Sequence, residues 1–283
     1  MFQNILFDLD GTLADPRDGI TRSIQFSLGR MEREIPSIDR AIYCVHDRRA
    51  SDTDSVEAGR SALPGPDKRR KYMKIIDLTH LIEPGMPVYP GTESPVFSYP
   101  FNLDKDGFVE TGISMMSHTG THMDAPGHII AGGITLDRMP VSMFHGQGIC
   151  IDAASGQKVI TAGDLAPYEA MMPAVDFVLF RTGWSRLWGN PGYFEGYPVL
   201  SREAAHRLND FKLKGIGFDT ISADAAGEMD LAIHQILLGT DRVILENLTR
   251  LEELPRTGFS IACFPLHFSG ADGSPVRAVA FVD

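Results

Sequence analysis

The larger part of the sequence predicts a mixed α/β (α+β) fold. From Lys74 onward, short apolar runs alternate with turns rich in Gly and Pro, which is the spacing expected of buried strands. Segments with a helical pattern lie between these runs, which indicates a sheet flanked by helices. The chain has 283 residues, 43% of them hydrophobic, so it is long and apolar enough to bury a sizeable core.

Several runs are expected to form strands because they are rich in β-branched and aromatic residues and end at turn residues. These are residues 75–78, 148–151, 177–181, 215–218, 242–245, 259–264 and 276–282. Helices are expected at 161–168, 201–213 and 232–238. The second helix has a clear start, because the Ser201 hydroxyl can cap the free backbone N–H groups and Glu203 places an acid in the first turn.

Residues 47–71 (DRRASDTDSVEAGRSALPGPDKRRK) have the composition of a linker. Only five of these 25 side chains are apolar, and they follow neither a helical nor a strand period. Burial of so little apolar surface cannot offset the entropy lost on ordering the chain. We therefore expect three parts: an N-terminal segment at 1–46, a linker at 47–71 and a main domain at 72–283.

The charge balance and the cysteine content narrow the function classes. A net charge of -11 leaves no basic excess to displace counterions from phosphates, which argues against binding to nucleic acid or to an anionic membrane. Three cysteines are too few for a disulfide framework and fit buried free thiols in a reducing compartment. The sequence contains neither a basic signal-peptide start nor a run of about eighteen apolar residues, so we expect a cytoplasmic protein.

The N-terminal segment contains the stretch FDLDGTLAD, an apolar run that includes Asp8 and Asp10. This stretch resembles the first motif of the haloacid-dehalogenase phosphatases, which implies a phosphoryl nucleophile at Asp8 and an acid/base at Asp10. The resemblance stops near residue 42, before the lysine and the second acidic pair that such enzymes use with Mg²⁺ and phosphate. Two carboxylates alone cannot assemble that site. We expect an inactive fragment, with phosphatase activity as the alternative.

The stretch SHTGTHMDAPGH at 117–128 gathers three histidines and an aspartate. A helix is unfavourable here because Gly120 weakens it and Pro126 would break it. A straight strand would separate His118 from His122 by about 13 Å, whereas the ligands of one metal ion lie about 2 Å from it. The chain is therefore expected to turn near Gly120, where the missing Cβ permits the bend.

After this turn, His122 and Asp124 are two residues apart and face the same side of an extended segment. With His118 they supply two imidazoles and one carboxylate, the ligand count of a catalytic divalent-metal site that keeps positions open for water and substrate. His128 follows a Pro-Gly bend and can reach the same point without being a ligand. The alternative is that backbone groups satisfy these histidines separately.

The segment HTGTHMDAPGH also matches the signature H-x-G-T-H-x-D-x-P-x-H of the metal-dependent cyclase-type hydrolases. That family includes kynurenine formamidases (arylformamidases) and isatin hydrolases. The similarity runs from about Ile75 to Asp283 and includes IIDLTHLIEPGMPVYPGT, GIGFDTISAD and FPLHFSGADGSPVRAVAF. It implies a swivelling β/β/α fold of mixed sheets with flanking helices, a homo-oligomer (dimer or tetramer), and Zn²⁺ or Mn²⁺ in a one-metal or two-metal site.

The same resemblance implies a role for each metal-ligating residue. His118, His122 and Asp124 correspond to ligands of a first metal ion. His234, in DLAIHQILLG, and Glu246, in VILENL, correspond to ligands of a second ion, to which Asp124 forms the bridge.

The resemblance also implies a general base, at His128. An imidazole with an ordinary pKa of about 6.5 can accept a proton from water and return it to a leaving nitrogen. Tyr89 and Trp184 lie in loops like those of the family and are candidates for an aromatic wall around a planar substrate, with core packing as the alternative.

These features together predict metal-dependent hydrolysis of a small non-peptide amide, either an aryl formamide or a cyclic amide. The sequence contains no G-x-S-x-G motif, so a serine acyl-enzyme is not expected. Tyr89 stands where many formamidases of this family carry Trp, which weighs against N-formylkynurenine as the substrate. The alternative from another class is a metal-binding protein without turnover.

Overall fold

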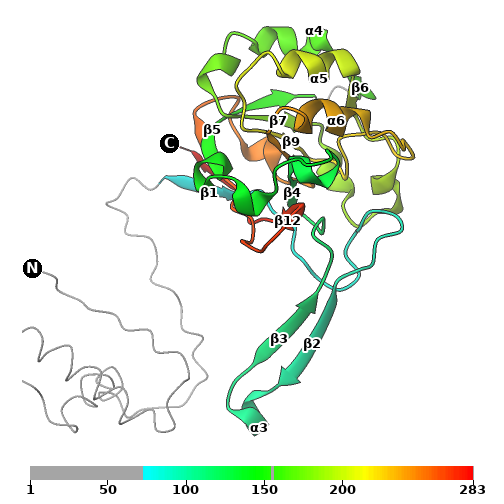
Figure 1. Ribbon diagram of the computed structural model, residues 1–283, viewed down its shortest axis with the longest axis vertical. Helices are drawn as coiled ribbons and strands as arrows, with labels where there is room; N and C mark the ends of the chain where they lie inside the picture. The colour runs from blue at the N-terminus through cyan, green and yellow to red at the C-terminus, as the bar shows by residue number, and fades with distance from the viewer. Residues whose placement is uncertain (1–72, 154–155, 283) are drawn as a thin grey trace, which may run out of the picture. The chain divides into compact units, whose positions relative to one another are not determined.

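A computed structural model describes residues 73–153 and 156–282, and in this part of the chain one mixed sheet forms the centre (Figure 1). Its strands are β1 (Lys74–Asp77), β4 (His122–Asp124), β5 (His145–Asp152), β7 (Phe177–Arg181), β9 (Gly215–Phe218), β10 (Val243–Glu246), β11 (Phe259–Ala262), β12 (Gly273–Pro275) and β13 (Val279–Val282). They lie in the order β1-β13-β11-β5-β7-β9-β10-β4-β12.

Short helices surround the sheet and join its strands. The α-helices beside it are α4 (Ala162–Leu165), α5 (Arg202–Leu208) and α6 (Ala232–Leu238). The 3-10 helices are η1 (Pro126–His128), η2 (Leu136–Arg138), η3 (Val141–Phe144), η4 (Ala166–Tyr168), η5 (Met172–Ala174), η6 (Trp184–Leu187), η7 (Pro191–Phe194) and η8 (Leu251–Glu253). Strands β6 (Val159–Ile160) and β8 (Val199–Leu200) form a separate parallel pair. The predicted mixed α+β fold is confirmed.

The four central strands, β5, β7, β9 and β10, run parallel, whereas the outer strands are antiparallel to their neighbours. A parallel strand covered on both faces reads as a continuous apolar run, and the first four residues of β7, FVLF, are all buried. Successive side chains point to opposite faces. Val178 packs in the cluster that includes Leu208 of α5 and Leu237 of α6, and Leu179 packs in the cluster on the other face.

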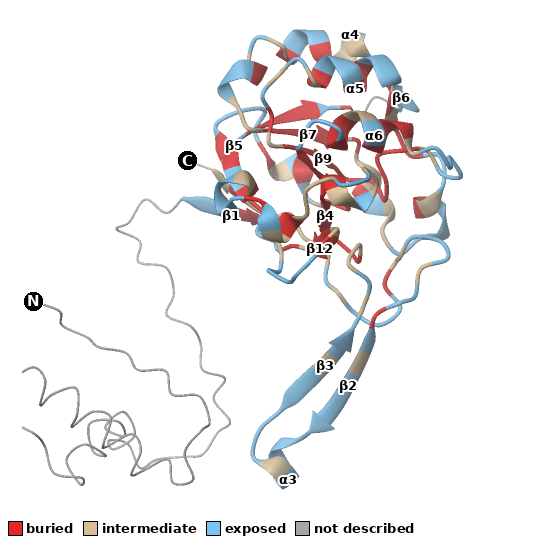
Figure 2. Ribbon diagram, in the orientation of Figure 1, coloured by how far each residue is buried: buried red, intermediate tan, exposed pale blue. Residues whose placement is uncertain are grey.

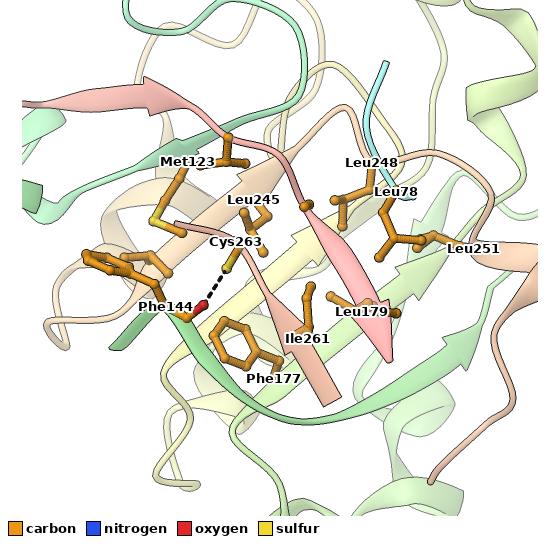
Figure 3. Packing of buried hydrophobic residues seen from close by; sticks show 14 of the residues in the cluster. Leu78, Met123, Phe144, Phe177, Leu179, Leu245, Leu248, Leu251, Ile261 and Cys263 are labelled. Carbon is orange, nitrogen blue, oxygen red and sulfur yellow. Dashed lines mark hydrogen bonds between the residues drawn. The ribbon is translucent and has the colours of Figure 1, made fainter. Parts of the chain in front are cut away.

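The hydrophobic cluster that contains Leu179 draws residues from both the centre and the edges of the sheet (Figure 3). Met123 of β4 lies in this core, together with Leu245 of β10 and Ile261 of β11. Because successive strand residues alternate in direction, burial of Met123 here directs both of its neighbours in β4 to the opposite face. The face of β4 opposite Met123 therefore carries His122 and Asp124, two of the predicted metal ligands.

Several elements have the bounds that the sequence predicts, namely β7, β9 and α6. Helix α5 begins as expected, with the Ser201 hydroxyl accepting a hydrogen bond from the Ala204 N–H at 3.1 Å. It ends at Leu208 instead of 213, so the predicted end is wrong. The Leu208 carbonyl, which a longer helix would pair with the N–H four residues on, instead accepts from the Phe211 N–H and from the Arg242 guanidinium, both at 3.3 Å.

A two-stranded arm that the sequence analysis did not predict stands away from the sheet (Figure 1). It consists of β2 (Val96–Phe101), α3 (Leu103–Asp106) and β3 (Glu110–Ser114), with the two strands antiparallel. Most of its residues are exposed (Figure 2). The exposed apolar side chains of this arm are Val96, Tyr99, Phe101, Leu103, Phe108, Val109 and Ile113. Such a patch is typical of an interaction surface.

Within residues 73–153 and 156–282, none of the helices has the length and apolar character needed to cross a membrane. The two cysteines in this part, Cys150 and Cys263, are buried free thiols, as expected. The phosphatase-like stretch with Asp8 and Asp10 and the linker at 47–71 lie outside the described residues.

Candidate metal centre

The predicted turn within the histidine cluster is present at Gly120. Its φ of 66° lies in the left-handed region that favours glycine. The carbonyl of Gly120 accepts hydrogen bonds from His122 Nδ1 and from the side-chain amide of Asn247, both at 2.8 Å. Strand β4 follows at once, so His122 and Asp124 project from the same face of the sheet.

Strand β10 brings the predicted Glu246 to the same place. It pairs antiparallel with β4, and the register sets Glu246 opposite His122. Side chains that lie opposite each other in an antiparallel pair are close together. The Glu246 carboxylate also accepts a hydrogen bond from the Ala223 N–H at 2.7 Å.

Helix α6 supplies His234, and Asp224 holds it in place. The Asp224 carboxylate accepts from the backbone N–H groups of Ile233 and His234, at 2.7 and 3.0 Å, so it caps the start of the helix. The same carboxylate pairs with His234 Nδ1 at 2.6 Å. Leu231, just before the helix, has a φ of 44°, an uncommon conformation for a branched residue.

The structure thus brings together all five residues that the sequence predicts as metal ligands. They form two groups that share one aspartate: His118, His122 and Asp124 in one, and Asp124, His234 and Glu246 in the other. Within each group the potential ligand atoms lie within 4.8 Å of one another. Asp124 Oδ1 is 3.3 Å from His122 Nε2, and Asp124 Oδ2 is 3.5 Å from His234 Nε2, so its two oxygens face the two groups.

The geometry and chemistry of these donors fit a divalent metal ion. Two donors about 2.1 Å from one ion at a tetrahedral angle lie about 3.4 Å apart. Glu246 lies at 3.5 Å from His122 Nε2 and at 3.2 Å from His234 Nε2. Because the Nδ1 atoms of both histidines are engaged elsewhere, their Nε2 atoms remain for a ligand. Asp124 and Glu246 are buried, and buried carboxylates of this kind are usually paired or bind metal.

The ionisation of the donor groups reflects their close approach. Burial alone would lower the pKa of the His118 imidazole, but the carboxylates of Asp124 and Asp272 outweigh it and raise this pKa to about 9. Burial also lowers the pKa of the His122 and His234 imidazoles, but neighbouring carboxylates outweigh burial and raise both pKa values. Metal ions bind imidazole in its neutral form, so a metal ion must displace protons from this site.

His128 lies beside the donors and differs from them in its ionisation. Its ring centroid is 4.0 Å from that of His118 and 6.4 Å from that of His234. Burial lowers the pKa of His128 below its usual value, and although Asp124 acts in the opposite sense, the positive charges of His118 and His234 add to the lowering. The His128 imidazole is therefore neutral at neutral pH and able to accept a proton.

A cavity of about 680 Å³ opens above these residues. Tyr89, one of the two candidates for an aromatic wall, lines it next to Glu93, Met116 and Met229. Trp184 is not among its lining residues: the indole packs in the aromatic cluster around Tyr193 and Tyr197, and its N–H donates to the Tyr193 carbonyl at 2.9 Å. The structure therefore does not bring Trp184 to the cavity.

The other histidines of the described part lie elsewhere. His80 stacks on Trp188 with 3.9 Å between the ring centroids. His267 lines a separate, mostly apolar cavity with Phe144 and Leu266.

Three polar residues of the site were not identified from the sequence, namely Asp224, Asn247 and Asp272. The Asn247 side chain donates to the Gly120 carbonyl and accepts a hydrogen bond from the Tyr193 hydroxyl at 2.7 Å. Asp272 contacts His118 across 154 positions of sequence. All three lie in stretches quoted above for the family resemblance, Asp224 in GIGFDTISAD, Asn247 in VILENL and Asp272 in FPLHFSGADGSPVRAVAF, so the resemblance is the signal that could have found them.

A known protein family matches the part of the chain that contains the histidine cluster. The Cyclase family model ("Putative cyclase") matches residues 76–225, more than half of the chain and the whole histidine cluster. The chain belongs to the Cyclase family. The match begins after the stretch with Asp8 and Asp10, so it gives no support to the phosphatase resemblance.

Relatives and solved structures cover the same part of the chain. A kynurenine formamidase of Salinibacter ruber is 28% identical over 209 residues, which is 73% of this chain and 97% of the relative. Isatin hydrolase A from Ralstonia solanacearum aligns with a TM-score of 0.68 and 28% identity, covering 75% of this chain and 92% of that one. A predicted metal-dependent hydrolase from Bacillus stearothermophilus aligns with a TM-score of 0.64 and 29% identity, covering 75% and 100%.

Proposed function

We propose that this chain is a metal-dependent amidohydrolase that acts on a small non-peptide amide, either an aryl formamide or a cyclic amide. One observation carries the proposal: two donor groups that share Asp124 lie at a cavity of about 680 Å³, with the His128 ring beside them. The similarity to a kynurenine formamidase and to an isatin hydrolase supports the amide as the bond that is cleaved.

The metal would be Zn²⁺ or Mn²⁺, as one or two ions. His118, His122 and Asp124 would hold a first ion, and Asp124, His234 and Glu246 a second. When bound, such an ion polarises a carbonyl and lowers the pKa of water toward about 7.

His128 is the proposed general base. In its neutral form it accepts the proton of the attacking water molecule, and as an imidazolium it returns this proton to the leaving nitrogen. His118, whose ring centroid lies 4.0 Å away, is proposed as a metal ligand, so its lone pair is not available for this role. Tyr89, at the cavity wall, is proposed to pack against a planar substrate.

A panel of substrates tests this function. We expect the metal-loaded protein to hydrolyse formanilide or isatin with kcat/KM above about 10⁴ M⁻¹ s⁻¹, the lower end of the usual range for enzymes. A glycyl dipeptide and p-nitrophenyl phosphate with Mg²⁺ serve as controls and should not be hydrolysed. If the metal-loaded protein hydrolyses neither formamides nor cyclic amides, the proposed function is wrong. The chain would then be a metal-binding protein without turnover.

We propose that the catalytic domain spans residues 72–283, because the sheet that carries the candidate ligands includes β1 (Lys74–Asp77) and β13 (Val279–Val282). We further infer a homo-oligomer, a dimer or a tetramer. The support is the arm formed by β2 and β3, whose exposed apolar side chains need a partner surface. The buried free thiols of Cys150 and Cys263 support a cytoplasmic location.

A further inference from the structure

Asp272 lies between two histidines that have different proposed roles. Its Oδ2 atom accepts a hydrogen bond from His118 Nε2 at 3.1 Å. The same oxygen is 3.6 Å from His128 Nδ1. His118, His128 and Asp272 form a third group of close donor atoms beside the two groups of the metal centre. One carboxylate oxygen is thus shared by a proposed ligand and the proposed base.

The fold holds Asp272 firmly at this position. The next residue, Gly273, begins β12 and stands opposite Asp124 in the pairing with β4. The Asp272 carbonyl accepts a hydrogen bond from the Ala125 N–H at 2.9 Å. The backbone that follows the Asp272 side chain is therefore tied to the strand that carries the metal ligands and to the residue after it.

Gly273 also makes room for the first histidine. A Cβ atom at this position would lie 2.5 Å from the His118 ring, a distance that no side chain can adopt without displacing the ring. The absence of a side chain lets the ring lie between β12 and Asp124. His118 is therefore enclosed by β12 on one side and by the shared aspartate on the other.

The two nitrogens of His118 have separate partners. Nδ1 is 2.7 Å from Asp124 Oδ1, on the side of the metal ligands, and Nε2 faces Asp272. A carboxylate that accepts the second N–H of a metal-ligating histidine fixes its tautomer and its ring orientation. His128 is related to Asp272 in the same way, because an Nδ1–H directed at Oδ2 leaves Nε2 with the lone pair that a base requires. The separation of 3.6 Å is longer than a hydrogen bond, and catalytic hydrogen bonds are often long before substrate binds.

We propose that Asp272 is a positioning residue that orients His118 as a metal ligand and His128 as a proton acceptor. The proposal rests on the function proposed above for these two histidines. It makes two separable claims, because metal binding can be measured without any substrate.

The metal claim is tested by titrating chelator-stripped protein with Zn²⁺ in competition with a chromophoric chelator. Asp272→Ala is expected to weaken Zn²⁺ binding by roughly 10–100-fold, the usual effect of removing such a partner. Asp272→Asn retains an acceptor oxygen in a side chain of the same shape, so it should recover part of this loss. Asp210→Ala, which removes an exposed aspartate paired with Arg207, is the control and should bind Zn²⁺ like the wild type.

A double-mutant cycle of Asp272→Ala and His128→Ala tests the claim that Asp272 orients His128. The quantity measured is kcat at saturating Zn²⁺. Asp272→Ala should lower kcat in the wild-type background and should have no further effect in the His128→Ala background, because it acts through His128. Unchanged Zn²⁺ affinity in both Asp272 variants would overturn the claim for His118. An equal loss of kcat in the two backgrounds, or none in either, would overturn the claim for His128. If no amide is turned over at all, the proposed function fails while the Zn²⁺ titration still decides the first claim.

Discussion

Replacing His122 by alanine is expected to remove the metal ion and, with it, amide hydrolysis. His122 is buried, its Nδ1 is held by the Gly120 carbonyl, and its Nε2 lies within 3.5 Å of both Asp124 and Glu246. His234 Nε2 also approaches both carboxylates, at 3.5 and 3.2 Å, but it belongs to the second donor group, so the first group would keep only His118 and Asp124. Metal affinity should therefore fall by more than the roughly 10–100-fold that follows loss of an outer partner.

The measurement is elemental analysis of His122→Ala after dialysis, together with its rate on the best amide of the panel. His206→Ala is the matched control, since His206 is an exposed histidine on α5 that does not line the cavity. The control should keep both metal and activity. A His122→Ala protein with one full equivalent of metal and wild-type kcat would show that this residue is not a ligand.

His128→Ala is expected to fail in the opposite way, with metal retained and turnover lost. His128 lies beside the donors without belonging to either group that shares Asp124, and its imidazole is neutral at neutral pH. Loss of a positioned acid/base lowers kcat by roughly 10²–10⁴-fold. A similar loss in kcat and kcat/KM would indicate an interaction made mainly in the transition state.

Steady-state kinetics and metal analysis on the same preparation separate the two roles. His267→Ala, in the separate apolar cavity, is the control and should behave like the wild type. If His128→Ala loses its metal as fully as His122→Ala, His128 is a ligand and the mechanism lacks its base. If it keeps wild-type kcat, another group accepts the proton.

The parts of the fold that the sequence predicts well are those whose signal is local. Strands β7 and β9 are short apolar runs between turns, and α6 has its helical pattern over its whole length. Strand β4 was predicted only as an extended segment after Gly120, and β12 was not predicted, because residues such as His122, Asp124 and Gly273 have little preference for strands. Their conformation comes from pairing with each other and with β10. The arm was missed for a related reason: Pro100 lies within β2, and a proline weakens a strand prediction.

The same distinction applies to the site. The turn at Gly120 and the common face of His122 and Asp124 follow from residue spacing and backbone geometry alone. His234 and Glu246 were placed by a family resemblance, because an isolated histidine on a helix carries no local sign of a metal. Asp272 meets His118 only through the β12–β4 pairing, 154 residues from it in sequence, so no local pattern predicts the contact.

The most direct test of the account is the amidase activity of the wild-type protein after its metal has been removed by a chelator. We expect the stripped protein to hydrolyse formanilide or isatin at less than about 1% of the original rate, and to regain activity on addition of Zn²⁺ or Mn²⁺. Thermal unfolding of the stripped protein controls for loss of the fold. Full turnover by metal-free protein, at a metal content well below one equivalent, would contradict the assignment of this site as a metal-dependent catalytic centre.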